Sequence, residues 1–134
     1  MNKLLFCLAL SLLAPLGLAA SAPAETSELA TLFSERGTGT LTFYECTGDG
    51  DSAEDICRSV NREKSVTFRR DGSATGNYFN RKKGFTGTWE QRPWGITVKE
   101  SSSISMPFTL EDKTYLIYHH EEAGDAISPF ILER

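Results

Sequence analysis

Residues 64–92, KSVTFRRDGSATGNYFNRKKGFTGTWEQR, contain three segments in which apolar and polar side chains alternate. The segments 64–70, 73–80 and 85–92 are separated by two short runs, Asp71-Gly72 and RKKG at 81–84, each of which contains a glycine. Alternation with a period of two is typical of a strand with one buried face, and Asp-Gly is a strong hairpin signal. The stretch therefore predicts three consecutive antiparallel strands.

The same period of two continues on both sides of this stretch. Further strands are predicted at 40–46, 96–101, 104–110, 114–120 and 128–134. Most of the predicted connections in the carboxyl-terminal half are only a few residues long, whereas parallel strands need crossovers of a dozen residues or more. We therefore expect a mainly β fold, an antiparallel up-and-down barrel or rolled sheet of about eight strands.

Two short helices are predicted outside the strands. In the segment 26–37, Thr26 or Ser27 is a candidate cap, apolar residues follow at helical spacing, and Gly37 is a stop signal. The second helix begins after Ser52, with Asp55 three residues further on, where a carboxylate favours the start of a helix.

The first residues have the three zones of a secretory signal peptide. Lys3 precedes an apolar run, and small residues follow around 20–24. We expect residues 1–22 to be the signal peptide, with cleavage between 20 and 24, and 23–134 to form a single domain. The prediction is a periplasmic or secreted protein without a membrane span in its mature form.

Cys46 and Cys57 are the two cysteines that remain after the predicted signal peptide. An even pair in an oxidising compartment predicts a structural disulfide. The closed loop would stabilise the fold by roughly 3 kcal/mol. A catalytic redox role would need a Cys-x-x-Cys spacing, which this pair lacks.

Four carboxylates lie between these cysteines, at Asp49, Asp51, Glu54 and Asp55. An EF-hand would need an oxygen ligand at loop position 5, glycine at 6 and glutamate at 12, and counting from Asp49 these positions fail. A looser calcium site stays open as an alternative. The favoured interpretation is that these acids belong to the start of the second helix.

A metal-binding interpretation of the sequence depends on His119. Neighbouring strand residues point to opposite faces, so His119 would pair with Glu121 rather than with His120, and would need a third ligand from elsewhere. No Gly-x-Ser-x-Gly or His-Glu-x-x-His motif is present. We therefore expect no enzyme activity and no cofactor, with a metal-binding envelope protein as the weaker alternative.

Charge is distributed unevenly along the chain. The formal net charge is −4, and removal of Lys3 makes it −5, which argues against general binding of nucleic acid. Residues 58–83 nevertheless contain a basic tract, with two predicted turn clusters at opposite ends of the barrel. These clusters are Arg69 and Arg70, and Arg81, Lys82 and Lys83. They are candidates for docking an acidic protein; the alternative is that they only provide solubility and edge protection.

Trp94 lies in the turn Arg92-Pro93-Trp94-Gly95, where small polar residues are usual. We expect its indole to fold back over the barrel mouth. The alternative is an exposed aromatic anchor for a partner, with Arg92 beside it.

The succession VTFRRDGSATGNYFNRKKGFTGTWE, GITVKE and FILER resembles the small lipocalin-like barrels of secreted bacterial proteins, over roughly residues 64–134. The resemblance implies a calycin-type barrel; such families include ligand carriers and enzyme inhibitors. In lipocalins the Gly-x-Trp signature opens the first strand, whereas Gly87-Thr88-Trp89 lies in the fourth predicted strand here. No ligand site is therefore carried over.

Together these features predict a secreted or periplasmic, non-enzymatic binding protein. The favoured partner is another protein, in an inhibitor or immunity type of interaction through the turn surfaces. The alternative is a carrier of a small apolar ligand, with a cavity lined by Phe68, Phe85, Trp89 and Ile96.

Overall fold

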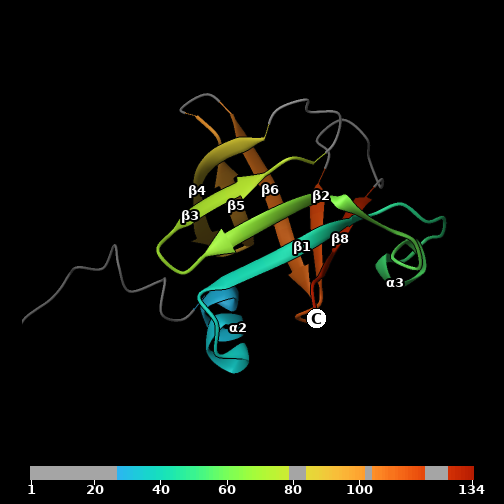
Figure 1. Cartoon of the computed structure of the whole chain (residues 1–134), viewed down its shortest axis with the longest axis horizontal. Helices are drawn as coiled ribbons and strands as arrows, with labels where there is room; N and C mark the ends of the chain where they lie inside the picture. Colours follow the sequence, from blue (N-terminus) through green and yellow to red (C-terminus); the bar gives the residue numbers. More distant parts are fainter. Residues whose placement is uncertain (1–26, 79–83, 102–103, 120–126) are drawn as a thin grey trace, which may run out of the picture.

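The structure is a computed structural model that describes residues 27–78, 84–101, 104–119 and 127–134 (Figure 1). The predicted signal peptide, residues 1–22, lies outside the described residues. Within those residues, no helix combines the length and the apolar character needed to cross a membrane.

Eight strands form a closed antiparallel barrel in which each strand pairs with its neighbours in sequence and β1 also pairs with β8. The mainly β prediction and the number of strands are confirmed. The strands are β1 (Thr40–Cys46), β2 (Val60–Arg69), β3 (Ser73–Gly76), β4 (Phe85–Arg92), β5 (Gly95–Lys99), β6 (Ser105–Glu111), β7 (Tyr115–His119) and β8 (Ile127–Leu132).

The largest differences from the predicted strand bounds are in β2, which begins four residues earlier than expected, and in β3, which ends at Gly76. The register between β1 and β2 shifts at Tyr44/Glu45, so that residues 62–64 form a bulge. The side chain of Asn77 holds this bulge, since it accepts a bond of 3.0 Å from the Ser65 amide and donates one of 2.9 Å to the Glu63 carbonyl. Such bulges have no period-two signature in the sequence.

Aromatic rings fill the barrel interior. The ring of Tyr78 makes edge contacts with Phe85 and Phe130, with centroids 5.3 and 5.4 Å apart. Nearer the other end, the rings of Phe68 and Trp89 are 6.3 Å apart at an interplanar angle of 86°. Edge-to-face pairs of this kind add roughly 0.5–1.5 kcal/mol each to the effect of burial alone.

Two strand glycines allow this close packing. A Cβ atom on Gly76 would lie 2.6 Å from the ring of Phe85 and 2.9 Å from the carbonyl oxygen of Ser65, and one on Gly87 would overlap the carbonyl oxygen of Lys99. Glycine is required at both positions because a neighbouring ring or backbone approaches closely.

Helix α2 (Glu28–Arg36) covers one end of the barrel (Figure 1). The Ala30 amide donates to the hydroxyl oxygen of Ser27 at 2.9 Å, and Gly37 ends the helix in the left-handed conformation, as the sequence predicts. The apolar face of α2 is buried in the same core cluster as the barrel interior, through Leu29, Leu32 and Phe33.

Helix α3 (Ala53–Ile56) lies at the opposite end of β1 (Figure 1). The Asp55 amide donates to the hydroxyl oxygen of Ser52 at 3.1 Å, which confirms the predicted cap. Cys46 and Cys57 form the predicted disulfide, with Cα atoms 4.6 Å apart. The bridge ties the end of β1 to the end of α3, which also contacts β8.

Candidate functional site

The barrel has an α2 end, which we define by helix α2 and the β2–β3, β4–β5 and β6–β7 turns. Arg70 follows β2, Trp94 lies between β4 and β5, and Lys113 lies between β6 and β7. Antiparallel hairpins place these alternate turns at the same end, so the fold brings together side chains that are far apart in the sequence.

Trp94 is 54% exposed at the tip of the β4–β5 turn. The prediction that it folds back over the barrel mouth is therefore wrong. Helix α2 covers this end instead, where the ring of Phe33 lies 6.3 Å from that of Trp89 inside the barrel. With that space occupied by α2, the Trp94 side chain stays more than half exposed.

The turn that carries Trp94 is held by polar contacts. Arg92 pairs with Gly95, which leaves a loop of Pro93 and Trp94 alone. The Gln91 side chain donates to the Gly95 carbonyl at 2.8 Å and accepts from the Glu28 amide at 3.2 Å. Gln91 was not singled out from the sequence, because a glutamine in an alternating strand carries no special signal. It connects the turn to α2.

Arg70 lies beside the same helix. Its guanidinium carbon is 5.5 Å from the centre of the Phe33 ring, and it donates to the Thr38 carbonyl at 3.4 Å. Arg69 points along the outer face of the barrel and donates to the Thr75 hydroxyl at 3.1 Å. The structure thus brings Arg70 and Trp94 to the same end of the barrel.

The second predicted basic cluster belongs to the β3–β4 connection, which leaves the barrel at the end opposite to α2. Its residues, Arg81, Lys82 and Lys83, lie outside the described residues. The expectation that the two clusters lie at different ends therefore stays a prediction.

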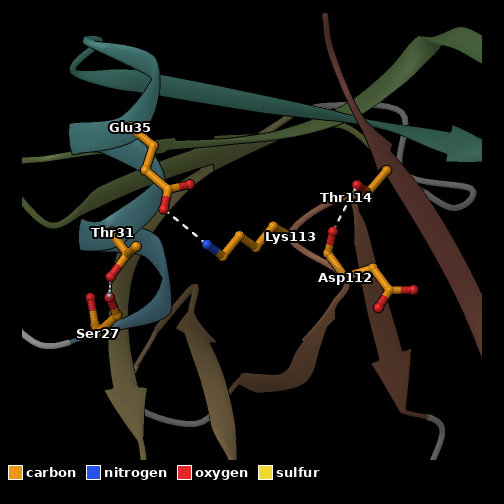
Figure 2. Close-up of polar contacts among 6 residues, drawn as sticks. All are labelled: Ser27, Thr31, Glu35, Asp112, Lys113 and Thr114. Atoms are coloured by element: carbon orange, nitrogen blue, oxygen red, sulfur yellow. Dashed lines mark hydrogen bonds and ion pairs between the residues drawn. The ribbon is translucent and has the colours of Figure 1, made fainter.

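The β6–β7 turn reaches across to α2 (Figure 2). The Lys113 ammonium forms an ion pair of 2.9 Å with the Glu35 carboxylate, on the helix face that also carries Ser27 and Thr31. Asp112 and Lys113 both have positive φ angles, 55° and 54°. Two consecutive residues other than glycine in this conformation are unusual, and the sequence gives no indication of them.

The four residues predicted to line a ligand cavity all lie inside the barrel. Their exposed fractions range from 0% for Phe68 and Ile96 to 8% for Trp89, with Phe85 at 5%. Phe68 contacts Trp89, and Phe85 contacts Tyr78, through the ring pairs described above. The side chains of Phe68, Phe85 and Trp89 are thus packed against other rings, and Ile96 is buried in the same core cluster.

The candidate metal ligands are not gathered together among the described residues, in which no group of three or more His, Cys, Asp or Glu side chains is placed to hold an ion. The His119 Nε2 atom lies 2.7 Å from the Thr109 hydroxyl oxygen, and Glu121 lies outside the described residues. In the acidic loop, Asp55 pairs with Arg58 at 3.1 Å.

Two side chains of the described residues have shifted pKa values. The Tyr44 hydroxyl donates to the Glu133 carboxylate at 2.9 Å, and this bond, with partial burial and the negative charge of Glu133, raises the pKa of Tyr44. Hydrogen bonds from the Ser73 hydroxyl and amide, at 2.7 and 2.9 Å, lower the pKa of Asp71. Both contacts tie neighbouring backbone segments together at the surface.

Comparison of the chain with protein-family models, with curated proteins and with solved structures finds no match.

Proposed function

We propose that this chain is a secreted or periplasmic binding protein without enzymatic activity, which docks another protein through the turns at its α2 end. The apolar run at the start of the sequence and the disulfide between Cys46 and Cys57 support export to an oxidising compartment. The closed barrel is of the type implied by the lipocalin-like resemblance, which supports a binding role.

The main observation in support of this proposal is the exposure of Trp94. Tryptophan and arginine are the residues most enriched among the side chains that dominate binding energy in protein interfaces. Trp94 is 54% exposed, whereas the aromatic side chains inside the barrel are almost completely buried. Leaving so large an apolar surface in water is unfavourable unless a partner covers it.

The surroundings of Trp94 also fit a docking surface. Pro93 restricts the turn, and Gln91 ties it to α2 and to Gly95. Arg92 lies next to it, fixed by an ion pair of 2.7 Å with Glu90. An anchor that is already held in position loses little conformational entropy on binding.

The basic residues add electrostatic complementarity to an acidic partner. Arg70 contributes at the α2 end, and we propose that Arg81, Lys82 and Lys83 extend the attraction from the β3–β4 connection. Their effect would be mainly on the association rate, which falls as salt screens the charges.

The alternative function is a carrier of a small apolar ligand. It rests on the interior position of Phe68, Phe85, Trp89 and Ile96. A ligand would have to displace rings that contact one another at centroid distances of 5.3–6.3 Å. Titration of tryptophan fluorescence with fatty acids, retinoids and haem tests this alternative, and a saturable change would favour it.

The protein-docking proposal is tested by capture with matched variants. Wild type, Trp94→Ala and Ile104→Ala are immobilised and exposed to envelope and extracellular extracts. Ile104 is the matched control because it is the other exposed large hydrophobic residue among those described, at 43%, and it lies at the opposite end of the barrel.

We expect a protein that is retained by wild type and by Ile104→Ala but not by Trp94→Ala. Retention by all three forms would contradict the role of Trp94. A variant with Arg81, Lys82 and Lys83 changed to glutamate tests the basic cluster separately, and unchanged retention at low salt would remove that cluster from the proposal.

A further inference from the structure

The cations of β2 differ from most of the other described cations in that they form no ion pair. Four basic residues follow one another along this strand and its end, and we call them the β2 ridge: Arg62, Lys64, Arg69 and Arg70. Among the described residues, none of the four forms an ion pair with a carboxylate. Four cations elsewhere do form such pairs, namely Arg58, Arg92, Lys99 and Lys113.

The ridge side chains have contacts that orient them without neutralising them. The Arg62 guanidinium lies 5.1 Å from the centre of the Tyr44 ring, and Arg70 lies over Phe33. Arg69 donates to the Thr75 hydroxyl. A cation over an aromatic face or beside a hydroxyl keeps its full charge, and the orientation reduces the entropy lost when an anion binds.

The sheet face around the ridge is rich in hydroxyl groups. Thr42, Thr67, Thr75 and Thr86 pair in register across β1 to β4 and form one row. The outward positions of 40–44, 65–69, 73–76 and 85–88 contain no carboxylate. The acids nearest in sequence are Glu63 in the bulge and Asp71 beyond the end of β2. Two carboxylates lie at the edges of this face: Asp71 interacts electrostatically with Arg69, and Glu133 accepts a hydrogen bond from Tyr44, whose ring lies under Arg62.

This arrangement fits a linear anion better than it fits a protein. Protein interfaces centre on a large apolar anchor, and the two exposed large hydrophobic residues among those described, Trp94 and Ile104, lie in turns away from this face. Arginine binds carboxylate and sulfate groups through paired hydrogen bonds, and threonine hydroxyls donate to and accept from sugar hydroxyls.

We propose that the β2 ridge is a second binding surface, which meets the α2 end at Arg70 but does not include the Trp94 turn, and that its ligand is a linear anionic polysaccharide. The chain would lie along β2, with its acidic groups against the arginine and lysine side chains and its hydroxyl groups against the threonine row. Because Arg62, Lys64 and Arg69 are spaced along one strand, a polymer can contact all three, whereas a single small anion would reach only one or two.

The test uses the full protein and two polymers that carry different acidic groups. Heparin carries sulfates and polygalacturonate carries carboxylates, while neutral dextran controls for binding by sugar hydroxyls alone. Affinities are measured by calorimetry at low and at physiological ionic strength. Wild type is compared with a ridge variant, Lys64→Gln with Arg69→Gln, and with a control, Arg58→Gln with Lys99→Gln, which changes the net charge equally but removes cations that are already paired.

We expect wild type and the control to bind at least one of the two acidic polymers and not dextran. The ridge variant should bind about tenfold more weakly at low ionic strength, with a smaller dependence on salt because fewer counterions are released. Trp94→Ala should bind the polymer as wild type does, which separates this surface from the proposed protein-docking turn.

Three results would overturn the proposal: no binding of either acidic polymer, an equal loss in the control, or tighter binding of duplex DNA than of both polymers. Thermal unfolding of each variant shows whether it is folded. If the ridge variant is not folded, Arg62→Gln with Arg70→Gln replaces it, since it removes the two outer cations of the ridge.

Discussion

The indole nitrogen of Trp89 donates a hydrogen bond of 2.7 Å to the carbonyl oxygen of Arg69. Trp89 belongs to β4 and its side chain is buried in the core, whereas Arg69 is the last residue of β2. The bond therefore joins the core to the β2–β3 turn. The centre of the same indole ring lies 6.3 Å from the centre of the Phe33 ring of α2. One buried side chain therefore fixes the turn and the helix that together shape the α2 end.

Trp89→Phe should lower the free energy of unfolding by about 1–3 kcal/mol, because the Arg69 carbonyl loses its partner in a largely buried position. Urea unfolding followed by circular dichroism measures this loss. Trp94→Phe is the matched control and should change the free energy by less than about 0.5 kcal/mol, since Trp94 is exposed. Equal losses would show that the indole bond is unimportant.

Comparison of Lys113→Gly with Lys113→Ala distinguishes the effect of backbone strain at Lys113 from the effect of its ion pair. Both remove the exposed ion pair with Glu35, which is worth roughly 0–1 kcal/mol. Only glycine also relieves the positive φ angle, which costs other residues roughly 1–2 kcal/mol. We expect the glycine variant to be about 1 kcal/mol more stable than the alanine variant in chemical unfolding. An alanine variant of equal or greater stability would contradict this account of the turn.

Cys46→Ser with Cys57→Ser should lower the free energy of unfolding by roughly 3 kcal/mol, because the unfolded chain gains the freedom of an open loop. Wild type unfolded in the presence of a reductant should show a similar loss. A titration of thiols in the exported protein provides a separate check. Two reactive thiols in that protein would contradict both the bridge and the predicted compartment.

Tyr44→Phe tests the link between β1 and the end of the chain. The bond to Glu133 raises the pKa of Tyr44 in the folded protein. Its whole stabilising effect is therefore present at pH values below about 10, the pKa of tyrosine in the unfolded chain. This stabilisation is lost as the pH rises through the higher pKa of the folded state. We expect wild type to be about 0.5–1.5 kcal/mol more stable than the variant near pH 7, with the difference disappearing at strongly alkaline pH. A difference that is constant with pH would argue against the bond.

The strands and both helices could be predicted because their signals are local. Period-two alternation gave β1 and β4 with their observed bounds, and Ser27, Ser52 and Gly37 marked helix ends through their own cap chemistry. The bulge at residues 62–64 could not be predicted, since it depends on Asn77, which is distant in sequence.

The candidate site was less predictable because it depends on which element covers the barrel mouth. A tryptophan in a turn is compatible with either burial or exposure. Three apolar residues of α2 occupy the mouth, so Trp94 is left outside. The β2 ridge was likewise recognised only as part of a basic tract, since the sequence does not show which cations have carboxylate partners.

The affinity of a purified partner for wild type and for Trp94→Ala, measured by calorimetry, tests the central claim most directly. We predict that Trp94→Ala binds about 30-fold more weakly, which corresponds to about 2 kcal/mol for an interface anchor, and that Ile104→Ala binds as wild type does. An affinity of Trp94→Ala within about twofold of the wild-type value would contradict the claim that this protein docks its partner through the turn at its α2 end.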